Sequence, residues 1–114
     1  MNLETAQHDD ITLLTPVTRR LDASVAKAFR EAVSGQIDSG HTRLLLDLSR
    51  VDFIDSSCLG TLISLLKIIN GKGEMALCAL NANIQTMFKL TRMDRVFTLY
   101  STQQEALAAM SGRT

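Results

Sequence analysis

The chain has 114 residues, 46% of them hydrophobic and 21% charged, a balance typical of one soluble globular domain. Twelve basic residues match twelve acidic ones, so the chain lacks the positive excess with which proteins bind nucleic-acid phosphates, and we expect no nucleic-acid partner. The first residues are polar and acidic and no apolar run approaches the ~20 residues of a membrane span, which predicts a cytoplasmic protein with no membrane partner.

The first part of the chain predicts two paired strands and a surface helix. Residues 11–18 are typical of a strand, although Pro16 has no N–H group and suits only an edge or a bulge, and we expect residues 3–7 to pair beside them. Asp22 then offers a helix N-cap, and apolar residues at four-residue spacing predict an amphipathic helix that ends near Gly40. That apolar stripe consists of Val25, Phe29, Val33 and Ile37.

The second part alternates strands with helices. Residues 43–48 contain an unbroken leucine run, which predicts a central strand covered on both faces, and a strongly apolar helix follows. Later strands are expected at residues 75–80 and 97–100, with helices around residues 84–91 and 102–110. Because helices of this length separate the strands, we expect parallel neighbours: an α/β domain with a mostly parallel sheet of about four or five strands and about four helices.

A polar segment stands where a strand leads into the apolar helix. In parallel sheets, functional loops gather beyond the carboxyl ends of the strands, and residues 52–60 form such a loop. Asp55, Ser56 and Ser57 are preferred helix-capping types, so capping alone explains them. A phosphate on a serine there would also meet free backbone N–H groups and the positive end of the helix dipole, and would add about −1.5 to −2 charge. Both interpretations stay open at this point.

The two cysteines, Cys58 and Cys78, lie in apolar runs with no histidine or second cysteine at a metal-ligand spacing. We interpret both as reduced thiols in or near the core. The sequence predicts neither a metal site nor a cofactor.

The same segment carries a resemblance to a known family. Residues 46–60 read LDLSRVDFIDSSCLG, which resembles the signature L-D-L-x-x-V-x-F-I/M-D-S-S/T-G-L-G of STAS-type anti-sigma factor antagonists. Leu21-Asp22 resembles the end of the family's G-x-L-D, and the likeness continues downstream through residues 73–75, 90–91 and 94–97. We therefore interpret residues 1–114 as a single STAS domain, with residues 1–10 as an N-terminal arm or edge strand.

This resemblance implies a partner switch. In the family, the unphosphorylated antagonist binds an anti-sigma factor that is itself a serine kinase, phosphorylation of the first serine after the aspartate ends that binding, and a metal-dependent serine phosphatase restores it. By this likeness Ser56 is the phosphorylation site, and Ser57 has a supporting or minor acceptor role. The resemblance further implies a chain that is not an enzyme and acts as a monomer.

The resemblance also assigns supporting residues. Asp22 and Asp55 match acidic positions that help to position the kinase, its metal or the loop. Cys58, Leu59 and Gly60 complete the motif and are expected to support the acceptor or contact the partner.

Three positions depart from the family pattern. Cys58 stands where the family usually has glycine, and we expect its side chain, close to the acceptor, to alter docking fit or partner choice. Arg19 stands where the G-x-L-D begins, and Arg92 replaces a glycine common after Leu-Thr. None of these changes removes the acceptor.

Other functions find less support. A serine nucleophile needs a base, and the only histidines are His8 and His41, both distant from Ser56 in the sequence. Residues 71–73, Gly-Lys-Gly, follow a helix and precede a strand, the reverse of a phosphate-binding loop. The second serious hypothesis keeps the fold without the switch: a STAS module that binds a nucleotide or serves as a fixed subunit of a transport or sensory complex.

Overall fold

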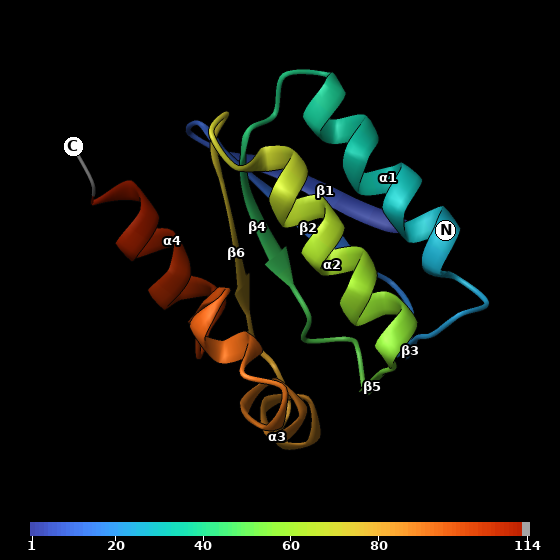
Figure 1. The fold of residues 1–114 in the computed structure, drawn as a ribbon. Coiled ribbons are helices and arrows are strands. Elements are labelled where there is room, and N and C mark those ends of the chain that lie inside the picture. The colour runs from blue at the N-terminus through green and yellow to red at the C-terminus, as the bar shows by residue number, and fades with distance from the viewer. Residues whose placement is uncertain (113–114) are drawn as a thin grey trace.

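Five strands form the central sheet of the computed structural model, which describes residues 1–112 (Figure 1). The first two strands pair antiparallel, and the other three pairs of neighbours are parallel. The expected α/β fold with a mostly parallel sheet is therefore confirmed. In spatial order the strands are β1 (Leu3–His8), β2 (Ile11–Pro16), β4 (Arg43–Asp47), β6 (Glu74–Cys78) and β7 (Thr98–Tyr100).

Within residues 1–112, four α-helices cover the two faces of this sheet unequally. Apolar residues of the first three helices share one large core cluster, while those of the last helix join a smaller cluster on the opposite face. Figure 1 shows the first two helices side by side and the last one apart from them. The helices are α1 (Ala26–Asp38), α2 (Ser56–Ile69), α3 (Ala82–Leu90) and α4 (Gln103–Ser111), and a 3₁₀ turn, η1 (Met93–Arg95), follows α3.

The leucine run of β4 explains why helices pack on both faces of the sheet. Side chains alternate along a strand, so Leu44 and Leu46 join the larger cluster beneath the first helices, whereas Leu45 joins the smaller cluster beneath α4. All three are fully buried. The predicted position of this strand at the centre of the sheet is confirmed.

Polar contacts fix both ends of α4 to β4. At one end Gln103 Nε2 donates to Asp47 Oδ2 at 2.9 Å, and at the other the Arg43 guanidinium donates to the carbonyl oxygen of Met110. Arg43 also forms an ion pair of 3.0 Å with Glu74. The smaller cluster is therefore closed by a short helix that the same strand holds at two points.

A separate pairing of two short strands was not expected from the sequence. In β3 (Arg20–Leu21) and β5 (Phe53–Ile54), Arg20 lies opposite Phe53 and Leu21 lies opposite Ile54. The second pair is buried, whereas the first is exposed. This pairing brings the segment that follows β2 against the segment that leads into α2.

Two local predictions differ from the structure. Asp22 does not cap α1, which begins at Ala26 with Val25 as N-cap and no side-chain cap, because the Asp22 carboxylate binds the backbone N–H of Ser24 at 3.1 Å. Strand β2 lies inside the sheet, not at its edge. Pro16 is tolerated there because it ends the strand, beyond Leu14, the last residue that pairs with β4.

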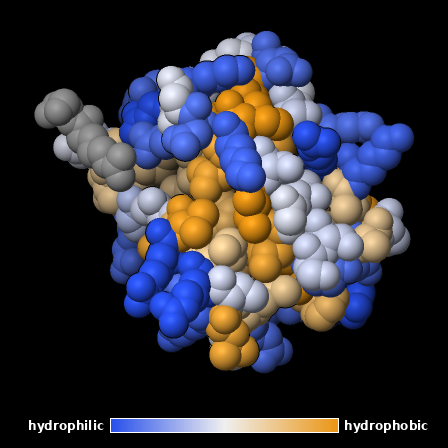
Figure 2. All heavy atoms as spheres, viewed as in Figure 1, coloured by the Kyte–Doolittle hydropathy of each residue, from blue (hydrophilic) through white to orange (hydrophobic). Residues whose placement is uncertain are grey.

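The surface is mixed on the face shown in Figure 1. Figure 2 shows an apolar band in the middle of this view, bordered by hydrophilic residues. Half-buried residues of α2, namely Ile63, Leu66 and Ile68, pack at the margin of the larger core cluster. Within residues 1–112, no helix is long and apolar enough to cross a membrane.

Candidate functional site

Ser56 is the first residue of α2, and both it and Ser57 are exposed. The helix starts at Asp55, the N-cap residue, whose Oδ1 accepts a hydrogen bond from the Cys58 backbone N–H at 3.1 Å. The N–H groups of the first turn have no partner within the helix and carry its positive partial charge. The Ser56 hydroxyl is therefore accessible to a modifying enzyme at a helix end that suits a phosphate.

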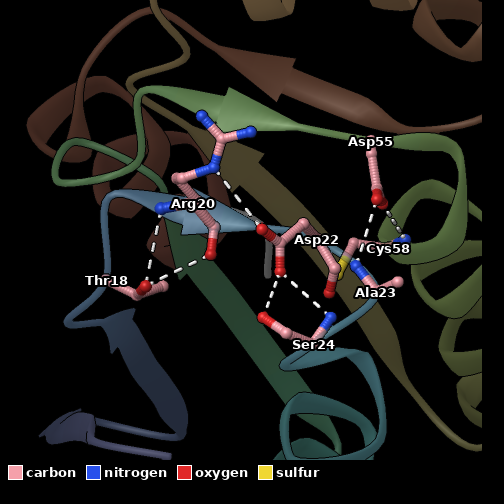
Figure 3. A network of polar contacts seen from close by, with 7 residues as sticks. All are labelled: Thr18, Arg20, Asp22, Ala23, Ser24, Asp55 and Cys58. Carbon is pink, nitrogen blue, oxygen red and sulfur yellow. Dashed lines mark hydrogen bonds and ion pairs between the residues drawn. The ribbon is translucent and has the colours of Figure 1, made fainter.

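The second oxygen of Asp55 joins this helix start to the preceding segment. Asp55 Oδ2 accepts a hydrogen bond from the Ala23 N–H at 3.1 Å, and the Asp55 N–H donates to the carbonyl oxygen of Leu21 at 3.0 Å. Figure 3 shows the carboxylate between Ala23 and Cys58. The structure thus brings Asp55 together with the loop that carries Asp22.

Asp22 lies in its own polar network, also drawn in Figure 3. Its Oδ1 accepts hydrogen bonds from the hydroxyl and the backbone N–H of Ser24, and its Oδ2 pairs with Arg20 Nε at 3.4 Å. The Ser24 hydroxyl, then its N–H and Arg20, outweigh the effect of desolvation and lower the pKa of Asp22. Asp22 therefore carries a negative charge at neutral pH, next to Ala23, whose N–H binds Asp55.

Cys58 and Leu59 are both buried. The Cys58 thiol contacts the carbonyl oxygen of Asp22 at 3.4 Å, and burial, followed by the charges of Asp55 and Asp22, raises its pKa to about 11. The expectation that Cys58 is a reduced thiol in or near the core is therefore confirmed. Its side chain points into the fold, and its effect on docking stays a prediction.

Gly60 lies one helical turn after Ser56 and is exposed. A Cβ atom built at this position meets no other atom within 4 Å. Since alanine favours a helix over glycine by ~1 kcal/mol, the fold itself gives no reason for glycine here. The five residues from Ser56 to Gly60 thus divide into an exposed group, Ser56, Ser57 and Gly60, and the buried pair Cys58 and Leu59.

Sequence reasoning missed several residues of the site. The guanidinium carbon of Arg20 lies 4.4 Å from the centre of the Phe53 ring, and Arg19 Nε pairs with Asp52 Oδ2 at 2.9 Å. The spacing of apolar residues does not predict these contacts, because they follow from the short pairing of β3 with β5. The Asp22–Ser24 contact did carry a signal, since an aspartate side chain often binds the backbone two residues later in a turn.

A groove of about 340 Å³ adjoins this motif. Strand β5 and the residue before it line one side, and α3 lines the other. The lining residues are Asp52, Phe53, Ile54, Asn83, Ile84 and Met87.

Residues 1–112 contain no group of three or more histidine, cysteine, aspartate or glutamate side chains that could hold a metal ion. The polar groups of the site are the exposed hydroxyls of Ser56 and Ser57, the carboxylates near them and the two arginines, Arg19 and Arg20. The predicted residues Asp22, Asp55 and Ser56 lie within one continuous region of the surface, as the contacts of Asp55 with Ala23 and Cys58 show.

The Thermotoga neapolitana protein named "Putative anti-sigma factor antagonist TM1081 homolog" is 32% identical over 107 residues, which cover 92% of this chain and 94% of that protein. The structure of an anti-sigma-factor antagonist (STAS) domain protein from Planctomyces limnophilus is 28% identical and superposes with a TM-score of 0.83, covering 95% of this chain and 96% of that one.

The Bacillus cell fate determinant SpoIIAA, solved in its phosphorylated form, is 17% identical and shares the fold with a TM-score of 0.70 over 96% of this chain and 99% of that one. The family model of the STAS domain matches residues 2–106. The match spans the central sheet, the motif at the start of α2 and the first turn of α4. The chain therefore belongs to the STAS domain family.

Proposed function

We propose that this chain is an anti-sigma factor antagonist that works by partner switching. In its unphosphorylated form it binds an anti-sigma factor that is a serine kinase, and phosphorylation of Ser56 by this kinase releases it. A metal-dependent serine phosphatase removes the phosphate and restores binding. Relatives that cover nearly the whole chain carry the name of anti-sigma factor antagonist, which supports this role.

The observation that carries the proposal is the position of Ser56. Its hydroxyl is exposed, while the backbone around it is fixed by both oxygens of the Asp55 carboxylate. A kinase can therefore reach the hydroxyl without unfolding α2, and the helix end can hold the added phosphate. Capping, the simpler explanation of the motif, accounts for Asp55 but assigns no role to the exposed Ser56.

Local charge explains how the phosphate ends binding. Phosphorylation adds about −1.5 to −2 charge at neutral pH. The surface around Ser56 already carries Asp22, whose pKa is lowered, and the exposed Asp52. A partner surface that fits the unmodified site meets a much more negative site after modification, and the phosphate also occupies volume at the contact.

The neighbouring exposed residues extend the proposed contact surface. Ser57 follows Ser56 directly and serves as a supporting or minor acceptor. Gly60 lies on the same side of α2 one turn later, and the open space around it allows the partner backbone to approach closely. The antagonist itself catalyses no reaction and acts in the cytoplasm as a single-domain monomer.

The test uses the serine-kinase anti-sigma factor of the same organism, with and without ATP. Ser56→Ala should bind the kinase in both conditions, whereas Ser56→Asp should bind at least about tenfold more weakly by titration calorimetry. The matched control is Ser111→Asp, which adds the same charge at an exposed serine at the end of α4. Peptide mass spectrometry should place the phosphate on Ser56. Equal affinity of the alanine and aspartate variants, with no phosphate on Ser56, would contradict the proposal.

A further inference from the structure

The groove between β5 and α3 is apolar at its base. Ile54 and Ile84 are buried, Met87 is half-buried, and Phe53 remains 40% exposed. Phenylalanine and methionine are among the residue types that are enriched at protein interfaces. The groove, of about 340 Å³, has room for a large apolar side chain.

The backbone around the groove is fixed before any partner arrives. The Arg19 carbonyl oxygen accepts hydrogen bonds from the N–H groups of Asp52 at 2.7 Å and Phe53 at 3.1 Å. Asn81 Nδ2 donates to the Asp52 carbonyl oxygen at 3.0 Å, which connects this segment to the start of α3. A preformed groove loses little conformational entropy on binding, so even a small contact can contribute to affinity.

Two arginines contact residues that line this groove, Arg19 through Asp52 and Arg20 through Phe53. Side-chain exposure is 86% for Arg19 against 58% for its partner Asp52, and 63% for Arg20 against 26% for its partner Asp22. In each ion pair the cation is thus the more exposed group. The Arg20 guanidinium also stacks on the exposed Phe53 ring. An approaching partner therefore meets the guanidinium groups before the carboxylates, and a complementary partner carries negative charge.

We propose that this groove binds a segment of the kinase partner in which an apolar side chain stands beside a carboxylate. The apolar side chain enters between Phe53 and Met87, and the carboxylate pairs with Arg19 or Arg20. The occupant is assigned to the kinase because Phe53 lies three residues before Ser56, so the inference rests on the proposed function. Arg19, which replaces a glycine of the family pattern, then distinguishes the partner of this chain from the partners of its relatives.

Two capped tripeptides, acetyl-Glu-Phe-Glu-amide and acetyl-Lys-Phe-Lys-amide, test the groove without the kinase. In ¹⁵N-edited spectra at millimolar peptide, we expect the acidic peptide to shift the amide signals of residues 52–54 and 83–87. The basic peptide should bind about fivefold more weakly, the size of one exposed charge pair. The double variant R19A/R20A should lose this preference, and Arg30→Ala, at an exposed position of α1, should keep it.

Equal shifts with both peptides, or shifts with neither, would overturn the inference. Shifts of the same signals with protein concentration alone would also overturn it, because they assign the groove to a second copy of the chain. With the kinase, R19E/R20E should weaken binding about tenfold while Arg30→Glu does not. The peptide result does not depend on Ser56. Failure of the proposed switch and failure of the proposed groove are therefore distinguishable, because the Ser56 variants test the first and the peptides test the second.

Discussion

Asp55 and Ala23 are joined by a hydrogen bond of 3.1 Å between the aspartate Oδ2 and the alanine N–H, across 32 positions of sequence. The same carboxylate caps α2 through its other oxygen. One side chain therefore positions both the helix that starts with the proposed acceptor and the loop that carries Asp22. A change at Asp55 should affect stability and phosphorylation together.

Asp55→Ala should lower the free energy of unfolding by about 2 kcal/mol, because it removes a helix cap and the contact with the Ala23 N–H. Asp55→Asn keeps an acceptor for one of the two contacts and should lose about half as much. Urea unfolding followed by circular dichroism measures both. A variant Asp55→Ala as stable as the native chain would show that the carboxylate does not hold the two segments together.

Cys58→Gly restores the family's usual residue but should destabilise this chain by about 1–2 kcal/mol. The substitution removes a fully buried side chain and puts glycine into the first turn of a helix. Affinity for the kinase should stay within about twofold, since the thiol does not reach the surface. Calorimetric binding of the folded variant checks this, and a large change in affinity would show that Cys58 acts on docking.

The two buried thiols predict a loss of stability at alkaline pH. Burial is the main cause that raises the pKa of Cys58 to about 11 and that of Cys78 to about 12, with nearby aspartates adding to both. Unfolded thiols titrate near 9.0, so above that pH the unfolded chain loses protons that the folded chain keeps. This contribution is complete below pH 9 and declines as the pH rises toward the folded values.

The double variant C58A/C78A isolates this effect from the titration of lysine and tyrosine. Between pH 8 and pH 10.5 its unfolding free energy should fall less steeply than that of the native chain. At neutral pH a disulfide reagent should react with the native thiols only slowly, because thiolates are scarce. Parallel pH profiles of the two proteins would contradict the assignment.

Arg92→Gly should stabilise the chain by up to about 1 kcal/mol, because Arg92 has a left-handed backbone that costs a residue with a Cβ atom about 1–2 kcal/mol. Its φ is 61°, at the turn between α3 and η1, and its side chain is exposed. The same geometry suits the glycine that the family pattern has after Leu-Thr. Arg92→Ala, the control, retains the strain and should leave the melting temperature nearly unchanged.

Gly60→Ala separates the needs of the fold from those of docking. Alanine should raise the unfolding free energy by about 0.5–1 kcal/mol, since alanine has a higher helix propensity than glycine and no atom obstructs the new methyl group. Affinity for the kinase should nevertheless fall, because the methyl group stands where the partner approaches. A variant that gains stability and keeps full affinity would remove Gly60 from the contact surface.

The order of elements was predictable because long segments carry clear periods. The leucine run of residues 44–46 predicted the central strand, and the apolar spacing after Asp55 predicted α2. The β3–β5 pairing escaped prediction because strands of two residues show no alternation. The N-cap assigned to Asp22 was wrong because Ser24, two residues later, offers that carboxylate two local donors.

The site was predictable only in part, for the same physical reason. The acceptor motif is contiguous, so the sequence could indicate that Ser56 opens a helix. Contacts such as Arg20 on Phe53 join residues 33 positions apart and depend on register. The burial of Cys58 and Cys78 was predictable, because both lie in apolar runs of the sequence.

The two contacts between α4 and β4, Gln103 with Asp47 and Arg43 with Met110, restrict the length of α4 to one that matches the strand. The strand distance from Arg43 to Asp47 is about 13 Å, and the helix distance from Gln103 to Met110 is about 10 Å. Inserting one residue between the two contacts would rotate the Met110 carbonyl by about 100° away from Arg43. A whole added turn would overshoot by about 5 Å. Relatives that keep both contacts should therefore vary in length beyond α4 and not within it.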